Sequence, residues 1–274
     1  MTAKGQCIRA VTFDLWETLF FERDGDSSRR SAIRCNNVAA AFNEFGVTVS
    51  AEQVGSAMKQ VAGRLLEMWE VNDDASHVEQ LELLVQKVSD GSLTLKNEWI
   101  KRLSEAYVSP FLEIPPCLNP DAESVLETLS ESGRRIGLIC NTGFTPGFAL
   151  RRFLDSEGVL GYFSFLAFSD EIGFRKPDPR IFHLAARKLK AEPHEVVHVG
   201  DNLRLDVWGA MNAGFRTILY ECEDAKDKIA EADPTSLVAK SRNLGALRTE
   251  HIVADMTITS FKMVLGAIRQ FEED

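Results

Sequence analysis

Short apolar runs recur along this chain and alternate with segments of helical periodicity. The runs cover residues 8–13, 136–140, 164–168, 196–199 and 217–220. Such short runs, rich in β-branched and aromatic residues, are typical of parallel strands buried on both faces. Strands that alternate with amphipathic helices predict an α/β fold with a doubly wound, mainly parallel sheet. In this architecture ligands bind in a crevice at the carboxyl ends of the strands.

Punctuation residues mark where several of the helices begin and end. Asn119 before Pro120 provides an N-cap followed by proline at the first helical position, and Gly133 provides a stop. Asp178 before Pro179 repeats the start signal. Near the C-terminus we expect a loop or short helix over residues 221–233 and a closing helix over residues 260–271.

The stretch from 22 to 112 interrupts this alternation and contains no convincing strand. Ser50 with Gln53, and Ser76 with Glu79, match capping boxes. Apolar residues then follow at helical spacing: Val54, Met58, Val61, Leu65 and Met68; Val78, Leu81, Val85 and Val88; Leu95, Trp99, Leu103 and Tyr107. We expect a helical cap over 22–112, inserted into a core formed by 1–21 and 113–274. Tethered above the carboxyl end of the first strand, the cap suits a lid over a site.

Composition excludes several classes of function. The 274 residues carry a formal net charge of -10, so a nucleic-acid footprint, which needs a basic stripe, is not expected. The first ten residues lack the apolar run of a signal peptide, and no window approaches the length of a membrane span. We therefore expect a cytoplasmic protein. The five cysteines have no paired short spacing, which argues against a zinc site or a disulfide framework.

Residues able to carry chemistry follow four of the predicted strands. They are Asp14, the segment Cys140-Asn141-Thr142-Gly143, Lys176, and Asp201 with Asp206. In a doubly wound sheet these positions converge on one crevice. A carboxylate there can act as a nucleophile, and crowded acidic groups call for a hard cation such as Mg²⁺. Lys176 would balance the charge, and backbone N–H groups at a helix start, at Asn141 and Thr142, would bind the transferred group.

These motifs resemble those of the haloacid dehalogenase-like hydrolases. The resemblance rests on Asp14 with Thr18, Asn141-Thr142-Gly143, Gly173 to Pro179 around Lys176, and Gly200-Asp201 with Asp206. It implies a nucleophilic Asp14 and a phosphate site formed by Cys140, Asn141, Thr142 and Lys176. It implies a Mg²⁺ held by Asp14, the main-chain carbonyl of Trp16 and Asp201, with Asp206 in support. The helical insert would be the family's mobile cap, and the substrate a small phosphorylated metabolite.

Two positions depart from the pattern of the family's phosphatases. Trp16 stands where an Asp protonates the leaving oxygen, and Cys140 stands where Ser or Thr is usual. General acid catalysis contributes roughly 10² to 10⁴ in rate, so we expect weak activity or a preference for good leaving groups. Relatives that cleave carbon–halogen bonds also carry an aromatic residue at position 16, so 2-haloacid dehalogenation is an alternative. A non-catalytic or regulatory relative is another. Neither the substrate nor the oligomeric state follows from the sequence.

Several further side chains have a structural and a functional interpretation. Glu17 either points to solvent, the preferred interpretation, or replaces the missing acid. His77 either packs within the cap or reaches the crevice, and we favour packing. Trp69 and Trp99 are expected in the cap core. A cluster of arginines at the entrance to the cap is expected to form a solvated basic face, or else to meet an anionic substrate: Arg23, Arg29, Arg30 and Arg34.

Overall fold

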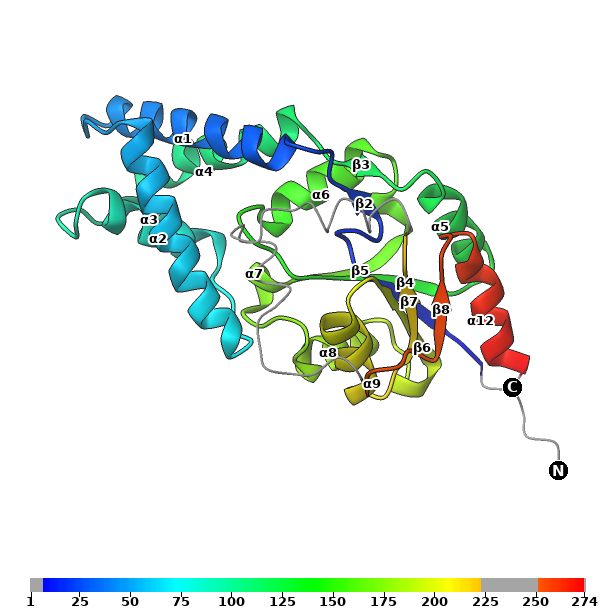
Figure 1. The fold of residues 1–274 in the computed structure, drawn as a ribbon. Helices are drawn as coiled ribbons and strands as arrows, with labels where there is room; N and C mark the ends of the chain where they lie inside the picture. Colours follow the sequence, from blue (N-terminus) through cyan, green and yellow to red (C-terminus); the bar gives the residue numbers. More distant parts are fainter. Residues whose placement is uncertain (1–6, 223–250, 274) are drawn as a thin grey trace.

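A six-stranded, fully parallel sheet forms the centre of the protein in a computed structural model that describes residues 7–222 and 251–273 (Figure 1). The strand order is β5-β4-β1-β6-β7-β8. The predicted doubly wound α/β class is confirmed, and β1, with the first candidate residue at its end, lies between β4 and β6. The strands are β1 (Ala10–Phe13), β4 (Arg135–Cys140), β5 (Phe163–Phe168), β6 (Val196–Gly200), β7 (Arg216–Tyr220) and β8 (Met256–Ile258).

Helices cover both faces of the sheet because its strands are apolar on both sides. In β1, Val11 and Phe13 join the core cluster beneath α5 (Ala122–Glu131), α6 (Gly147–Ser156) and α12 (Met263–Glu273). Ala10 points to the opposite face and joins the cluster beneath α8 (Pro179–Lys188) and α9 (Gly209–Asn212). This alternation follows from the two-residue period of a strand. Because β1 is packed on both faces, Asp14, the residue that follows it, is held in place.

Four helices lie between β2 (Phe20–Phe21) and β3 (Cys117–Leu118) in the chain and form a separate layer beside the sheet (Figure 1). These two short strands are antiparallel and pair where the chain leaves and re-enters the core. We call the layer of four helices the helical insert: α1 (Asp26–Glu44), α2 (Ala51–Glu70), α3 (His77–Val88) and α4 (Asn97–Glu113). That residues 22–112 form a separate cap domain remains a prediction.

Most of the predicted helix starts are observed. Both capping boxes form, and the Asp178 carboxylate accepts the Arg180 N–H ahead of α8. The start at Asn119 is wrong, because α5 begins at Ala122 and the Asn119 side chain accepts the N–H of Asp121 instead. The expected buried face of α3 is also displaced, since Val78 is 39% exposed whereas the preceding His77 is buried.

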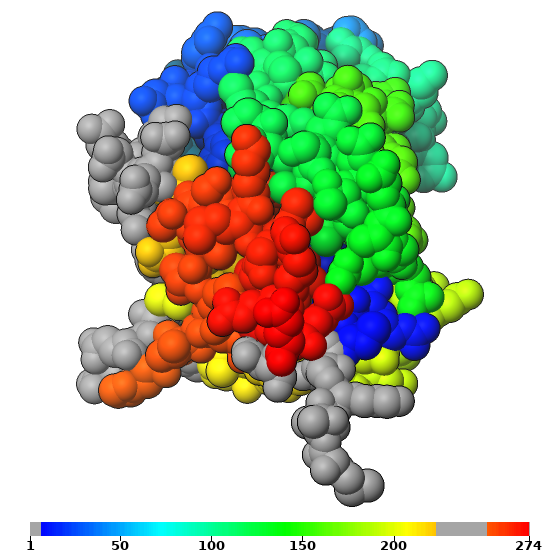
Figure 2. Space-filling model, turned by 90° about the vertical axis from the view of Figure 1, so that its right-hand side faces the viewer, coloured from blue at the N-terminus to red at the C-terminus, as the bar shows by residue number. Residues whose placement is uncertain are grey.

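The C-terminal segment closes one edge of the molecule. In Figure 2, α12 (red) lies against the end of the α4–α5 region (green) and the first described residues (blue). Glu272 there accepts hydrogen bonds from Arg134 and from the N–H of Ile8. The predicted closing helix is confirmed, whereas most of the expected element over 221–233 lies outside the described residues. No helix in the described ranges is both long and apolar enough to cross a membrane.

Candidate active site

Asp14 lies at the carboxyl end of β1, inside a cleft of about 370 Å³ between the sheet and the helical insert. Its N–H donates to the carbonyl of Val199 on β6 at 2.9 Å, which extends the strand pairing by one residue. Its side chain therefore points out of the strand ends into the cleft. The core contributes Asn141, Thr142, Lys176, Asp201 and Asp206 to the same cleft, as predicted.

Lys176 links two of the carboxylates. Its Nζ lies 2.6 Å from Asp14 Oδ1 and 2.6 Å from Asp206 Oδ1, with the side chain 1% exposed. Burial disfavours the ammonium charge, but the two carboxylates outweigh this effect and raise the pKa of Lys176. Burial conversely raises the pKa of Asp14, and Lys176 opposes that shift. An ammonium ion at this point thus keeps two buried acids close together.

Asn141 holds the backbone of Lys176 rather than pointing into the cleft with a free amide. Its Oδ1 accepts the N–H of Lys176 at 2.8 Å, and its Nδ2 donates to the Lys176 carbonyl at 2.9 Å. Both polar ends of the amide are therefore engaged. This contact joins the loop after β4 to the Lys176 loop, and it explains why an asparagine suits the position.

Asp206 is fixed by three donors. Lys176 and His198 Nε2, at 3.1 Å, reach Oδ1, and the N–H of Asn202 reaches Oδ2 at 3.0 Å. Burial alone would raise the pKa of Asp206, but Lys176 and His198 lower it well below its usual range. Gly200 makes room for this side chain, because a Cβ there would lie 2.3 Å from Asp206 Cγ. Asp206 is therefore an ionised anchor for Lys176.

Three carboxylates could share a cation. Asp14, Asp201 and Asp206 each offer one oxygen, and these oxygens lie within 4.8 Å of one another. Lys176 pairs with Asp14 and Asp206, and together with Asp201 the three carboxylates outnumber this ammonium by two charges, which a divalent cation would balance. An all-oxygen donor set suits Mg²⁺. The residues therefore fit the predicted metal, and the main-chain carbonyl of Trp16 as a further ligand stays a prediction.

Cys140 and Thr142 are placed differently from the expectation. Cys140 is fully buried in the core beneath the sheet and forms no part of the cleft wall; burial raises the pKa of its thiol well above the usual value. The Thr142 N–H is not free, because it donates to Ser169 Oγ at 2.8 Å. The expected helix start at these residues is wrong, since α6 begins only at Gly147.

Trp16 and Glu17 both line the cleft. The Trp16 ring lies edge-on to Phe20, at 6.3 Å between centroids, and to Phe111 of α4, at 6.2 Å. It thus packs the loop after β1 against the helical insert. Glu17 adopts a left-handed backbone conformation with φ 60° and is half-buried on the cleft wall. Its assignment as a solvent-facing residue or as the replacement acid stays a prediction.

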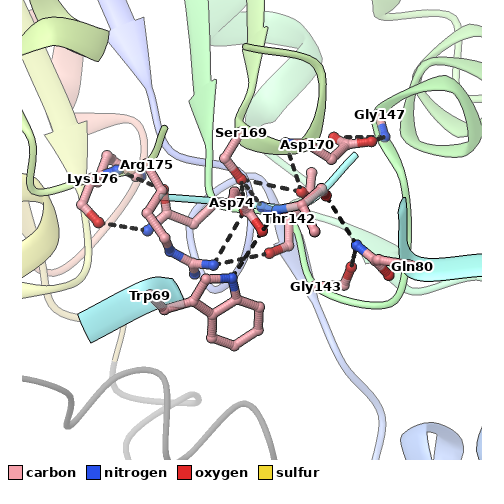
Figure 3. A network of polar contacts seen from close by, with 12 residues as sticks. Trp69, Asp74, Gln80, Thr142, Gly143, Gly147, Ser169, Asp170, Arg175 and Lys176 are labelled. Atoms are coloured by element: carbon pink, nitrogen blue, oxygen red, sulfur yellow. Dashed lines mark hydrogen bonds and ion pairs between the residues drawn. The ribbon is translucent and has the colours of Figure 1, made fainter. Parts of the chain in front are cut away.

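A buried polar network joins the helical insert to the core, and the sequence did not indicate it (Figure 3). Asp74, in the loop between α2 and α3, accepts from Trp69 Nε1 at 2.8 Å and from Ser169 Oγ at 2.5 Å. Arg175 Nη1 lies 3.2 Å from the same carboxylate and stacks over the Trp69 ring. Ser169 and Arg175 follow Asp74 by 95 and 101 residues, so no local pattern reveals the contact. Trp69 therefore also lines the cleft instead of serving only the core of the insert.

The arginines near the start of the helical insert and His77 differ in whether they line the cleft. Arg23 and Arg29 are exposed, whereas Arg30 and Arg34 are buried and line the cleft, so the expectation of a solvated basic face fails for these two. His77 lies edge-on to Tyr107 and Phe148 and forms no part of the cleft wall, in line with a packing role. Burial lowers its pKa to about 4.

The structure is a doubly wound α/β fold with an acidic cluster and a lysine at the carboxyl ends of the strands. Residues 8–214 match the family model of haloacid dehalogenase-like hydrolases, and the chain belongs to this family. It is 27% identical to a glyceraldehyde 3-phosphate phosphatase from Methanopyrus kandleri, over 97% of this chain and 100% of that protein.

Solved structures agree in fold. A 2-haloacid dehalogenase from Pseudomonas syringae pv. Tomato has a TM-score of 0.62 at 20% identity, with 96% of this chain and 99% of that chain covered. A phosphatase of the same superfamily from Thermococcus onnurineus has a TM-score of 0.58 at 21% identity, covering 95% of this chain and 97% of that one. Both a phosphatase and a dehalogenase share this architecture, so the choice between the two activities depends on the side chains of the site.

Proposed function

We propose that the protein is a Mg²⁺-dependent phosphatase that hydrolyses small phosphorylated metabolites through an aspartyl-phosphate on Asp14. The observation that carries this proposal is the cluster of Asp14, Asp201 and Asp206 around Lys176 at the base of the cleft. Family relatives that act on phosphate esters support it. A 2-haloacid substrate brings no phosphate and requires no such cluster of carboxylates.

Each residue of the site has its own role in the proposed reaction. The Asp14 carboxylate attacks phosphorus, and the bond from phosphorus to the ester oxygen breaks. The leaving group departs as an oxyanion, which takes its proton from solvent water. Water then attacks the phosphorus of the aspartyl-phosphate, which restores Asp14 and releases inorganic phosphate. Lys176 holds Asp14 in position and offsets negative charge near the transferred group. Mg²⁺, held by Asp14 and Asp201, would neutralise the phosphoryl oxygens.

The residue at position 16 cannot protonate the leaving oxygen. Trp16 has no proton to give to an alkoxide, because its indole N–H is not an acid in the physiological range. Glu17 and Glu22 are acidic residues on the cleft wall, and burial raises the pKa of Glu22. Without an acid at position 16, we expect acyl and aryl phosphates to react faster than alkyl phosphates.

The first test combines one variant with three assays. With Mg²⁺ present, the natural chain should hydrolyse para-nitrophenyl phosphate, and chelation should stop the reaction. Asp14→Asn should lower kcat by at least about 10³-fold, because the nucleophile is lost. Its thermal midpoint should not fall, since a buried carboxylate with a raised pKa is removed while Lys176 keeps Asp206 as its partner.

The alternative functions give different outcomes when an assay of halide release is added. A dehalogenase should release halide from 2-chloropropionate with chelator present, and Asp14→Asn should stop that release. A non-catalytic relative should do neither. Comparison of para-nitrophenyl phosphate with an alkyl phosphate adds the leaving-group test: equal and fast turnover of both would show that another residue, such as Glu17 or Glu22, supplies the proton.

A further inference from the structure

The buried face of α1 changes character as it passes over the cleft. Toward its C-terminal end this face is apolar, with Val38, Ala41 and Phe42 fully buried. One and two turns earlier the same face presents Arg34 and Arg30, each 6% exposed. Helix positions four residues apart share a face, so these arginines replace core residues where the helix borders the cleft. Burying a cation is costly unless a partner offsets its charge.

Arg30 has such a partner. Its Nη2 forms an ion pair with Glu22, its Nη1 donates to the Ile114 carbonyl at 3.0 Å, and its guanidinium lies over the Phe111 ring. The Arg30 charge is therefore balanced by Glu22, which lies between β2 and α1. Of the remaining cations on the cleft wall, Lys176 is paired with Asp14 and Asp206, and Arg175 is paired with the Asp74 carboxylate.

Arg34 differs from all of these. Its Nε donates to the Tyr107 carbonyl at 2.8 Å, and its guanidinium lies over the rings of Tyr107, at 5.0 Å, and Phe144, at 5.9 Å. Within residues 7–222 and 251–273, no carboxylate forms an ion pair with it, and neither Nη1 nor Nη2 has a hydrogen-bond partner. Burial lowers the pKa of Arg34, and Arg30 adds to this shift. Arg34 therefore lines the cleft as a buried cation that a carbonyl and two aromatic rings contact, and no carboxylate of the described residues pairs with it.

We propose that Arg34 binds a second anionic group of the substrate, separate from the phosphoryl group that Asp14 attacks. Two parallel N–H groups of a guanidinium match the paired oxygens of a carboxylate or a phosphate. Ser27 and Ser31, one turn apart on the same helix, also line the cleft and offer hydroxyl donors. Because Arg34 belongs to the insert and Asp14 to the core, a substrate with anions at both ends would contact both layers.

This inference rests on the proposed phosphatase function and narrows its substrates to phosphate esters that carry a further carboxylate or phosphate. The volume of the cleft, about 370 Å³, restricts such substrates to small molecules. A phosphate ester with a neutral remainder would leave the buried Arg34 uncompensated. The site should therefore discriminate between two esters of equal size that differ only in this charge.

The test measures kcat/KM with Mg²⁺ for phosphoglycolate, which carries a carboxylate, and for 2-hydroxyethyl phosphate, its neutral counterpart. In the natural chain we expect the carboxylate ester to be favoured about 10- to 100-fold, as for a charge-assisted, bidentate hydrogen bond. Ethylene glycol bisphosphate tests the second kind of anion in the same series. Preference for the bisphosphate, the carboxylate or both supports the proposal and identifies the anion.

Variants then assign the preference to Arg34. In Arg34→Met the ratio of kcat/KM between the two esters should fall to about one, and in Arg34→Lys, which keeps the charge but loses the planar fork, it should fall partway. Arg29→Met is the matched control, because Arg29 lies on the same helix with its side chain 68% exposed and paired with Asp26. This control should keep the ratio of the natural chain.

Two outcomes would overturn the inference. One is a natural chain that prefers neither the carboxylate nor the bisphosphate over the neutral ester, and the other is an Arg34→Met variant that keeps the full preference. Arg34→Lys keeps the helix propensity and the length of the side chain, so a ratio remains measurable if Arg34→Met does not fold. If the proposed phosphatase function itself is wrong, the natural chain hydrolyses neither these esters nor para-nitrophenyl phosphate, so the two failures can be distinguished.

Discussion

Trp16 is the residue that most distinguishes this site from that of an ordinary phosphatase. Because it lies on the cleft wall two residues after Asp14, Trp16→Asp should place a carboxyl group close to the leaving oxygen. We expect turnover of an alkyl phosphate to rise by about 10² to 10⁴-fold, the contribution of a well-placed general acid. Initial-rate measurements with 2-hydroxyethyl phosphate and para-nitrophenyl phosphate would show whether the gain is confined to the poor leaving group.

The same substitution has a structural cost. Trp16 loses its edge contacts with Phe20 and Phe111, so the free energy of unfolding should fall by about 1–3 kcal/mol. Trp16→Phe is the matched control, because it keeps an aromatic ring and supplies no acid. A comparable gain in turnover from Trp16→Phe would show that space, rather than a proton donor, limits the reaction.

At the scale of elements, the strands and their terminal residues were predictable because they depend on local sequence. Runs such as 196–199 are apolar on both faces, and the residues that follow them must lie at one edge of the sheet. The three-residue strand β8 was not predicted, because a segment of this length at a sheet edge has little periodicity. The π-helical turn Leu203–Trp208 after Asp201 was also missed, since a single turn with i→i+5 hydrogen bonds leaves no distinct pattern in the sequence.

The partners of individual side chains were harder to predict than the elements. Lys176 and Asp206 were expected in the crevice, and both line the cleft, because the segments that follow β5 and β6 begin at the same edge of the sheet. Arg34 and Asp74 were not, because their surroundings depend on how the helical insert packs on the core. An arginine on an amphipathic helix is normally solvated, and only the observed orientation of α1 shows that this one is buried.

The contact between the α2–α3 loop and the core should contribute strongly to stability. Asp74 and Arg175 are both buried, so Asp74→Ala leaves an uncompensated cation and should lower the free energy of unfolding by about 3–5 kcal/mol. The double variant Asp74→Ala/Arg175→Met should regain a large part of this loss, because it removes both charges. Urea unfolding at 25 °C measures each value.

A neighbouring residue provides the control for this prediction. Asp73 has a side chain 57% exposed and lies 3.9 Å from Arg180, so Asp73→Ala should change stability by less than about 1 kcal/mol. Equal losses from Asp73→Ala and Asp74→Ala would contradict the view that the buried pair joins insert and core. So would a double variant no more stable than Asp74→Ala alone.

The start of α6 predicts a dependence of stability on pH. Asp170 accepts the Gly147 N–H, and burial raises its pKa to about 6 from an ordinary value of 3.8. Between about pH 4 and pH 6 the folded state therefore binds a proton that the unfolded state has lost, and stability falls as the pH rises. Asp170→Asn removes this penalty while keeping an oxygen for Gly147.

The measurement compares the natural chain with Asp170→Asn at two pH values. From pH 4 to pH 7 the stability of the variant relative to the natural chain should increase by about 2–3 kcal/mol, as the size of the pKa shift implies. Urea unfolding at both pH values gives the two differences. A difference that does not change with pH would show that Asp170 is not protonated in the folded protein near pH 5.

At the scale of the whole molecule, the acidic cluster should couple metal binding to stability. The chain carries a net charge of -10, and Asp14, Asp201 and Asp206 concentrate part of it at one point of the core. A cation that binds only the folded state stabilises it by about 2.7 kcal/mol at a concentration 100-fold above its Kd. For a chain of this length we expect Mg²⁺ to raise Tm by about 5 °C.

Substitution of a carboxylate within the acidic cluster should remove the effect of Mg²⁺ on stability. Asp201→Asn removes one ligand and one source of repulsion, so the variant should be at least as stable as the natural chain in chelator and should respond little to Mg²⁺. Asp90→Asn, at an exposed position between α3 and α4, should respond as the natural chain does. Thermal unfolding with and without Mg²⁺ distinguishes these cases without a substrate. An Asp201→Asn variant that keeps the full Mg²⁺ response would place the cation elsewhere, and Lys176 would then be the main counter-charge of Asp14.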